Sequence, residues 1–268
     1  MRVMSVIVSA AIAWSVCACA QQTPQPGSVM LHAHVLHDKT SVLVLAHQAR
    51  PLQSALAAIA EEYGWVIDFE DPPYRSRYDL VDNTDPQWHA NHPSEEGVTR
   101  IAGEAFESEF QEGLDIGTPS GEERVLNKIV SDYNTSGNPG KFAVHREGRG
   151  RYAVIGKFIK DESGRDRHVS AILDTPVSIA TQRLSAMQAV ALILDVLSVR
   201  TGQRVALMDF PVNAYNAAEV TVGGADETAR HLLLQTLDQT DTALRWDLLF
   251  DNDSNTYFLT VSVRPIKD

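Results

Sequence analysis

The chain has 268 residues, of which 44% are hydrophobic and 22% charged, and its formal net charge is −12 at pH 7. These proportions are ordinary for a globular protein and argue against wholesale disorder, and the length suits one or two domains with a buried core. The negative charge argues against a nucleic-acid partner, because phosphate binding requires clustered Lys and Arg, and against docking on anionic membranes.

The first twenty residues have the pattern of an export signal. Arg2 precedes an uncharged, mostly apolar stretch, 3–16, that is short for a membrane span. Ala18-Cys19-Ala20 has the small-x-small form that an ordinary signal peptidase accepts, which would release a chain beginning at Gln21. Val16-Cys17-Ala18-Cys19 also resembles a bacterial lipobox, in which Cys19 is lipidated. Both interpretations stay open, and both predict a periplasmic protein, either free or anchored by an N-terminal lipid.

Both cysteines of the chain lie in this segment, so the mature protein is expected to have no disulfide. Its fold must then depend on hydrophobic burial alone. Residues 21–28 are predicted to be a polar linker, since they contain two prolines and no apolar periodicity.

A first β-α-β unit is predicted between residues 29 and 73. Val29–Val35 alternates like an edge strand, whereas Ser41–His47 is continuously apolar and is expected to be buried on both faces. Pro51 suits the first turn of a helix, and Gly64 suits its end. The apolar face of this helix consists of Leu52, Leu56, Ile59 and Tyr63, and a strand at 65–69 follows and ends at Asp71-Pro72-Pro73.

The first repeat continues to residue 160 after an insertion. Tyr78–Val81 indicates a short strand, and residues 84–103 lack periodicity, so we predict an exposed insertion there. The elements that follow are a strand at Glu104–Gln111 with Phe106 and Phe110 on one side, a helix at Ser120–Tyr133 with a capping box of Ser120 and Glu123, and a hairpin around Gly148-Arg149-Gly150.

The second repeat, residues 161–268, has the same order of elements, and Lys160–His168 reads as the joint between the halves. Its strand at Ile172–Ile179 is interrupted by Pro176, which indicates a sheet edge or a bulge. The next helix begins near Leu184, has Met187, Val190, Leu194 and Leu197 on its apolar face, and ends at Gly202. The remaining elements are a strand at 204–208 that ends at Asp209-Phe210-Pro211, a short strand at Glu219–Val222, a helix capped by Asp226 with the face Ala229, Leu233 and Leu237, and a hairpin of Leu244–Phe250 with Tyr257–Val263.

Helix, glycine, apolar strand, acidic residue and proline thus occur twice in the same order, which indicates an internal repeat. Each half reads β-α-β followed by β-α-β-β. We therefore predict an α+β fold with two tandem β-α-β-rich repeats, whose helices pack on small mixed sheets.

The repeated unit resembles the short N-terminal domain of secretins and TonB-dependent receptors, the STN domain. The residues that carry the resemblance are mainly core and turn positions, namely Pro51, Leu52, Ala55, Leu56, Ile59, Ala60, Gly64, Val66 and Ile67. It covers about one segment in each half and implies small periplasmic β-α-β modules that recognise protein partners and carry no catalytic residues. Neither a secretin pore domain nor a TonB box is visible, so the resemblance implies a stand-alone member.

Candidate chemistry is sparse. His32, His34 and His37 form an H-x-H-x-x-H cluster whose imidazoles suit zinc or copper, although no carboxylate or cysteine with clear ligand spacing accompanies them. A solvated edge strand is the preferred interpretation, and we expect neither a metal nor a cofactor. His145 and His231 lie on predicted elements and are interpreted as surface or packing residues.

A second group lies in the insertion and contains Trp88, His89, His92, Glu95 and Glu96. Loops often carry function, but no nucleophile and base are placed together here, so a polar loop with an anchoring tryptophan is preferred. Asp68 with Asp71, and Asp209, suggest paired carboxylates for acid–base work; an aspartate that ends a strand before a proline explains both copies more simply.

The sequence predicts no reaction. It favours a non-enzymatic bacterial envelope protein that presents sheet edges and an acidic surface to a protein or wall-associated partner, with strand addition as the docking mode. The competing hypothesis is an envelope hydrolase or metal-dependent enzyme that uses the histidines at 32–37 or the loop at 88–96. Metal analysis with the His32→Ala and His89→Ala variants separates the two. A third hypothesis is self-association, which sedimentation detects.

Overall fold

The computed structural model describes residues 33–38, 41–47, 49–92, 97–113, 115–148, 150–211, 219–240 and 242–263. These residues belong to one compact unit that spans residues 31–268. The predicted signal segment, the linker 21–28 and Cys19 lie outside the described residues. The fold is α+β, as the sequence predicts.

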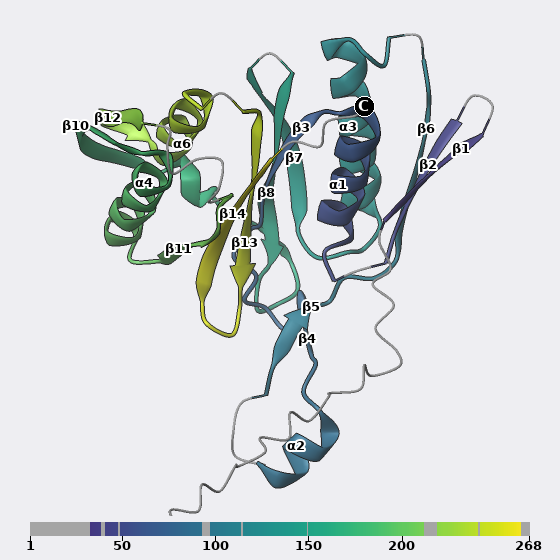
Figure 1. Ribbon diagram of the computed structural model, residues 1–268. Helices are drawn as coiled ribbons and strands as arrows, with labels where there is room; N and C mark the ends of the chain where they lie inside the picture. Colours follow the sequence, from purple (N-terminus) through teal and green to yellow (C-terminus); the bar gives the residue numbers. More distant parts are fainter. Residues whose placement is uncertain are drawn as a thin grey trace, which may run out of the picture. The chain divides into compact units, whose positions relative to one another are not determined.

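The elements of the first half are shown in purple to teal in Figure 1. In chain order they are β1 (His34–Asp38), β2 (Ser41–Ala46), α1 (Pro51–Tyr63), β3 (Val66–Glu70), β4 (Leu80–Asp82), α2 (Pro86–Asn91), β5 (Thr99–Ile101), β6 (Phe106–Gln111), α3 (Pro119–Thr135), β7 (Lys141–Gly148) and β8 (Arg151–Lys160). The predicted insertion thus holds α2 and β5, and β4 pairs with β5 at its base.

The second half follows through a short strand and a 3₁₀ turn. Its elements are β9 (Asp166–His168), η1 (Ile172–Asp174), β10 (Pro176–Ser185), α4 (Ala186–Thr201), β11 (Arg204–Asp209), β12 (Glu219–Thr228), α6 (Ala229–Asp238), β13 (Leu244–Asp251) and β14 (Thr256–Val263). The joint predicted at 160–168 is ordered, because β9 pairs with the end of β8.

The two halves repeat one topology. The order β2-α1-β3, β6-α3-β7-β8 in the first half corresponds to β10-α4-β11, β12-α6-β13-β14 in the second. The strand pairings correspond as well: β2–β6 and β10–β12 are antiparallel, β3–β8 and β11–β14 are parallel, and β7–β8 and β13–β14 are hairpins. Even the register agrees, since Ile67 faces Tyr152 in one copy and Val205 faces Tyr257 in the other. The predicted internal repeat is therefore confirmed.

In each repeat the helices are covered by strands from both of its sheets. Helix α1 contacts β2 and β3, α3 contacts β6 and β7, and α4 contacts β10 and β11. The apolar faces predicted from the sequence are the buried ones, for example Leu56 and Ile59 in α1 and Leu194 and Leu197 in α4. Each such side chain contributes about 1.5–3 kcal/mol on burial, so the core stabilises the fold without disulfides.

The three-stranded sheets of the two repeats join into one larger sheet. Its strand order is β11-β14-β13-β3-β8-β7, with β9 beside β8, and the junction is a parallel pairing of β13 with β3. Strand β11 consequently runs antiparallel to β3, its counterpart in the first repeat. We call this the main sheet, and the β3–β13 junction the seam.

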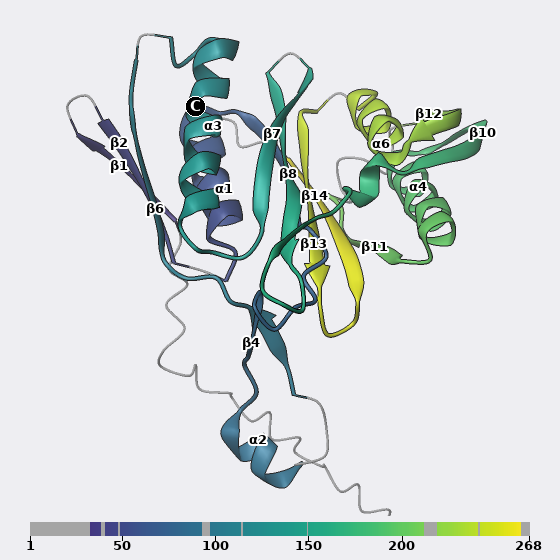
Figure 2. The same cartoon turned by 180° about the vertical axis from the view of Figure 1, so that it is seen from behind.

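The two repeats place their helices on opposite faces of the main sheet. Phe69 pairs with Asp247 across the seam, and paired residues of parallel strands point to the same face. Asp247 hydrogen-bonds Gln53 of α1, whereas the next residue of β3, Glu70, points the other way and contacts Arg230 of α6. Figures 1 and 2 show the two helix pairs on either side of the sheet.

Helix ends follow the sequence in part. Pro51 begins α1, and both Gly64 and Gly202 have the left-handed conformation, with φ of 66° and 68°. The capping residue of α3 is Thr118, however, and not the predicted Ser120, because Pro119 takes the first helical position. Helix α6 is capped by Thr228.

Four further predictions were wrong. Asp226 does not cap α6 but has φ of 59° within β12, which extends to Thr228 and not only to Val222. Strand β2 is buried on one face, because its other face is covered by no helix, so its burial alternates. Pro176 begins β10 instead of interrupting it, since residues 172–174 form a 3₁₀ turn.

Candidate binding surface at the sheet edges

Side chains of β3 replace part of the backbone ladder at the seam. Only two residue pairs connect β3 and β13 in regular register, and the N–H of Asp71 donates to the carbonyl of Leu248 at 2.9 Å. Beyond them, carboxylates accept the backbone N–H groups of β13: Asp68 Oδ1 accepts from Trp246 at 2.9 Å and Asp71 Oδ2 from Phe250 at 3.1 Å. The seam is thus specified by side chains of β3.

The two buried acids of β3, and Asp71 directly after it, each pair with a different arginine. Asp68, Glu70 and Asp71 are at most 2% exposed. The three ion pairs join Arg151 Nε to Asp68 Oδ2 (3.0 Å), Arg230 Nη2 to Glu70 Oε2 (2.6 Å) and Arg50 Nε to Asp71 Oδ2 (2.6 Å). A buried carboxylate without a partner costs several kcal/mol, so these cations are required where the acids are.

Burial shifts the titration of these acids upward. It raises the pKa of Asp68 to about 7, and attraction to Arg151 acts against it. The pKa values of Glu70 and Asp71 are also raised by burial, each against the attraction of its own arginine. All three acids contact arginines and backbone N–H groups. Their role is therefore structural, because these contacts join the two repeats.

Arg230 connects the seam to the second repeat. Its Nε donates to Asp174 of η1 at 2.9 Å, and its guanidinium lies 5.5 Å from the centre of the Trp246 ring. The N–H of Leu173 in η1 donates to Glu70 at 3.3 Å. Helix α6, η1 and β13 therefore all contact Glu70 of β3.

A cavity of about 490 Å³ opens at one end of the seam. Its charged lining includes Glu122, Glu147, Arg151 and Asp238. These groups are engaged with other protein groups: Arg151 binds both Asp68 and Asp238, and Glu122 accepts from the Tyr152 hydroxyl at 3.0 Å. The cavity is polar, and the charged residues named here form ion pairs or hydrogen bonds with other residues of the protein.

Strand β11 occupies the place of β3 in the second repeat but has no charged seam. The positions of Asp68, Glu70 and Asp71 are held there by Ala206, Met208 and Asp209. Among the described strands, none lies on the outer side of β11, which is the end of the main sheet. Met208 is 72% exposed.

The open side of β11 carries identifiable backbone groups. In β3 the N–H of Asp71 faces the seam, so those of Ile67 and Phe69 do too, because alternate residues of a strand point the same way. The corresponding residues of β11 are Val205 and Leu207. The N–H of Val205 donates to Ser198 Oγ of α4 at 2.9 Å, and its carbonyl accepts from the same hydroxyl at 3.2 Å. Leu207 is therefore the residue whose outward N–H and C=O groups are the candidate contact for a further strand, and the register slips only after it.

The other edges of the second repeat are better protected. In the first repeat β1 covers the outer side of β2, and no described strand covers the corresponding side of β10. Strand β10 begins with Pro176 and has register shifts near Val177 and Ile179, which are devices that discourage strand addition. Strand β11 keeps a regular run of four residues, Arg204–Leu207, and is the better candidate for docking.

The structure describes two of the three histidines that suggested a metal site. His32 lies outside the described residues, and His34 and His37 are three residues apart on the exposed strand β1. His37 lies 3.5 Å from Glu62 and 3.4 Å from Glu112. Among the described residues no His, Cys, Asp or Glu side chains are grouped in threes or more so as to hold a metal ion.

The insertion residues form a small exposed cluster on α2. The ring of Trp88 stacks on His92 with centroids 4.7 Å apart, and His89 Nε2 lies 2.9 Å from Asp82 Oδ2. Helix α2 has no buried residue, and Glu95 and Glu96 lie outside the described residues. Trp88 therefore packs against a residue of the insertion and not against the core. We call this insertion, residues 84–103, the arm.

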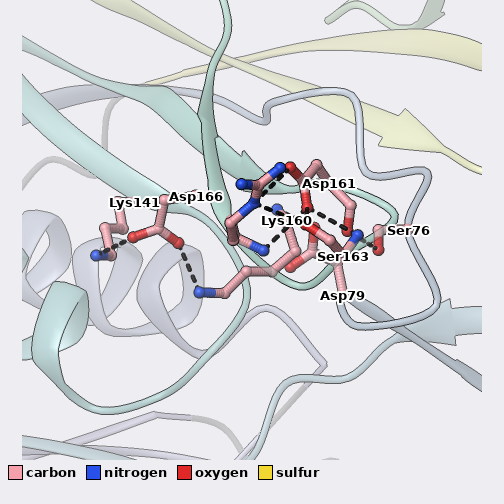
Figure 3. Close-up of polar contacts among 8 residues, drawn as sticks. Ser76, Asp79, Lys141, Lys160, Asp161, Ser163 and Asp166 are labelled. Carbon is pink, nitrogen blue, oxygen red and sulfur yellow. Dashed lines mark hydrogen bonds and ion pairs between the residues drawn. The ribbon is translucent and has the colours of Figure 1, made fainter.

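A polar cluster ties the base of this arm to the β8–β9 turn (Figure 3). Buried Asp79 accepts the backbone N–H of Lys160 at 2.8 Å, and Ser76 Oγ donates to the carbonyl of Asp161 at 3.0 Å. Asp166 bridges Lys141 and Lys160. These contacts position the entry to β4.

The paired aspartates have different roles in the two copies. Asp71 directly follows β3 and Asp209 ends β11, so both lie at a strand end before a proline, as predicted. Asp71 is in addition buried in the seam, whereas Asp209 is exposed. His145 and His231 are exposed residues, and partial desolvation of the imidazole, with repulsion from Lys157, lowers the pKa of His145.

Comparison of the chain with models of protein families, with curated proteins and with solved structures finds no match. In the part of the chain that the structure describes, no helix is both long and apolar enough to cross a membrane.

Proposed function

We propose that the protein is a non-enzymatic module of the bacterial envelope that captures an extended segment of a partner protein at the outer edge of β11. The observation that carries the proposal is the repeat itself. In the first copy, the side of β3 that corresponds to the open side of β11 is occupied by a parallel strand, β13. The same edge in the second copy is unoccupied among the described strands.

The seam indicates how a partner strand lies on β11. It runs parallel to β11, as β13 runs parallel to β3, and it bonds the N–H and C=O groups of Leu207, the counterpart of Phe69 at the seam. Main-chain bonds of this kind provide affinity, and side chains provide specificity. The net charge of −12 favours a segment with positive charge, which associates faster with an acidic protein.

The resemblance to STN domains and the export signal support the same function. Each repeat has the β-α-β order that the resemblance implies. The STN domains that it resembles recognise protein partners. Export through an ordinary or lipoprotein signal places the module in the periplasm, where Cys19 is the lipidation site on the second interpretation.

Photo-crosslinking from position 208 in intact cells tests the proposal. A crosslinker at Met208 is expected to form one main adduct with an envelope protein, whereas a crosslinker at Arg165, whose side chain is 81% exposed elsewhere, is expected to form none. Addition of the purified partner must then slow hydrogen exchange at the amide of Leu207.

Leu207→Pro and Leu207→Ala form a matched pair for this experiment. Both remove the same half-buried side chain, and only the proline removes the outward N–H. The adduct is expected with Leu207→Ala and not with Leu207→Pro. Equal adducts from the two variants, or equal adducts from positions 208 and 165, would contradict edge capture.

A further inference from the structure

Within the described strands, the two ends of the main sheet are β7 and β11. These strands are the counterparts of β13 and β3, which are joined at the seam. The chain therefore carries, at the two ends of its main sheet, the counterparts of the two edges that it already joins internally. On β11 Ser198 bonds the backbone of Val205, and Leu207, the counterpart of Phe69, is the position for the contact. A second copy of the chain is the occupant that this geometry fits.

The relation between the repeats is a half-turn with a shift along the sheet. Strand β11 runs antiparallel to β3, and the helices of the two repeats lie on opposite faces of the main sheet. Repeating this operation places β7 of another copy parallel to β11. Such a contact is heterologous and does not close, so it would extend into a fibre of indefinite length.

Asn134 occupies the backbone groups that β7 would need for this contact. Its Nδ2 donates to the carbonyl of Phe142 at 2.9 Å, and the N–H of Phe142 donates to its Oδ1 at 2.8 Å. Phe142 is the counterpart of Trp246, because the two pair with equivalent residues of β8 and β14, Gly156 and Val261. Asn134 thus takes the place on β7 that Asp68 takes on β13.

The second helix of each repeat is α3 in the first and α6 in the second, and its length decides whether the hairpin that follows is capped. Helix α3 has 17 residues and α6 has 10, and Asn134 lies in the last turns of α3. Helix α6 ends before any equivalent position. The N–H of Trp246 is therefore available to Asp68, and β13 joins β3 while β7 stays at the sheet end.

We propose that Asn134 is an edge cap that keeps copies of this chain from joining head to tail through β7 and β11. The inference shares the open edge of β11 with the proposed function and requires no partner protein. Natural sheets commonly block their edges against such pairing. Here one side chain blocks the donor and the acceptor of a single residue, Phe142, which is the second residue of β7.

Removing the cap and then restoring a seam contact tests the inference by sedimentation velocity of the purified protein over a wide concentration range. Asn134→Ala exposes the Phe142 backbone groups, so its sedimentation coefficient is expected to rise with concentration while that of the wild type stays constant. Adding Ala206→Asp places a carboxylate where β3 has Asp68. The double variant is expected to associate at least tenfold more tightly than Asn134→Ala.

Val144→Pro in the Asn134→Ala background is the control, because it removes another outward N–H of β7 at an edge position that tolerates proline. Its sedimentation is expected to match that of the wild type. Thermal unfolding shows that each variant is folded. Constant sedimentation of both Asn134→Ala and the double variant would overturn the inference, as would association that survives Val144→Pro. Assembly without a crosslink from position 208 would overturn the proposed function alone.

Discussion

Strands β3 and β11 hold the same place in two copies of one unit, and they differ in what lies beside them. Strand β3 is buried at all five residues between β8 and β13, whereas β11 is half exposed at the end of the main sheet. Three acids and three arginines accompany the buried strand, and Ala206 and Met208 replace two of the acids on the edge strand.

The difference teaches how the two copies are specified. The copy with buried charges has a specific junction, since each charge is stable there only with its own partner. The copy with neutral residues ends the main sheet, and it is there that we propose a further strand joins. The predictions that follow examine this contrast from the largest expected effect to the smallest.

Removing a cation of the seam is expected to have the largest effect. Arg230→Ala leaves Glu70 buried without its partner, so the free energy of unfolding is expected to fall by about 3–5 kcal/mol. Arg183→Ala, which breaks an exposed pair with Glu219 between β10 and β12, is expected to cost less than about 1 kcal/mol. Urea denaturation followed by tryptophan fluorescence measures both, and equal losses would contradict the contrast.

The seam is also expected to respond to pH. The folded pKa of Asp68, about 7, lies above its value of about 3.9 in an unfolded chain. The folded state therefore binds the extra proton, and this contribution to stability is complete below about pH 4 and is lost as the pH rises through 7.

Asp68→Asn keeps an acceptor for the N–H of Trp246 and removes the titration. Between pH 4 and 7, the wild type is expected to lose stability relative to this variant by at most about 1.4 kcal/mol per pH unit, the limit for one proton. Parallel stability curves for the two proteins would show that Asp68 does not take up a proton on folding.

The smallest effect concerns a feature that the copies share. Gly64 and Gly202 end α1 and α4 with positive φ, so alanine at either position is expected to cost about 1–2 kcal/mol for the backbone conformation. Thermal unfolding of the two single variants measures this. Clearly different costs would mean that the two helix ends are not equivalent.

Local patterns predicted much of the fold. The periodicity of Leu52, Leu56 and Ile59, together with Gly64 at the helix end, located α1 and β3, and the same pattern located α4 and β11. The cap of α3 was missed because Pro119 moves the helix start to Thr118, two residues before the predicted Ser120. Thr118-Pro119 can be read as part of a turn or as a cap followed by the first helical residue, and the sequence alone does not separate the two.

The seam was not predictable from spacing in the chain. Asp68 and Glu70 alternate with apolar residues as exposed side chains of a half-buried strand do, and Arg151 and Arg230 lie 83 and 160 residues further along the chain. The parallel pairing of β8 with β3 brings Arg151 beside Asp68, and the packing of the second repeat against β3 brings Arg230 beside Glu70. One available signal was the presence of acids within an otherwise apolar run.

Hydrogen exchange at two equivalent amides tests the account most directly. In the free protein, the amide of Phe69 in β3 is expected to exchange slowly because it faces the seam, and that of Leu207 in β11 is expected to exchange fast because it faces the open edge. Equal protection of the two amides would contradict the account, since the two copies would then have equally occupied edges.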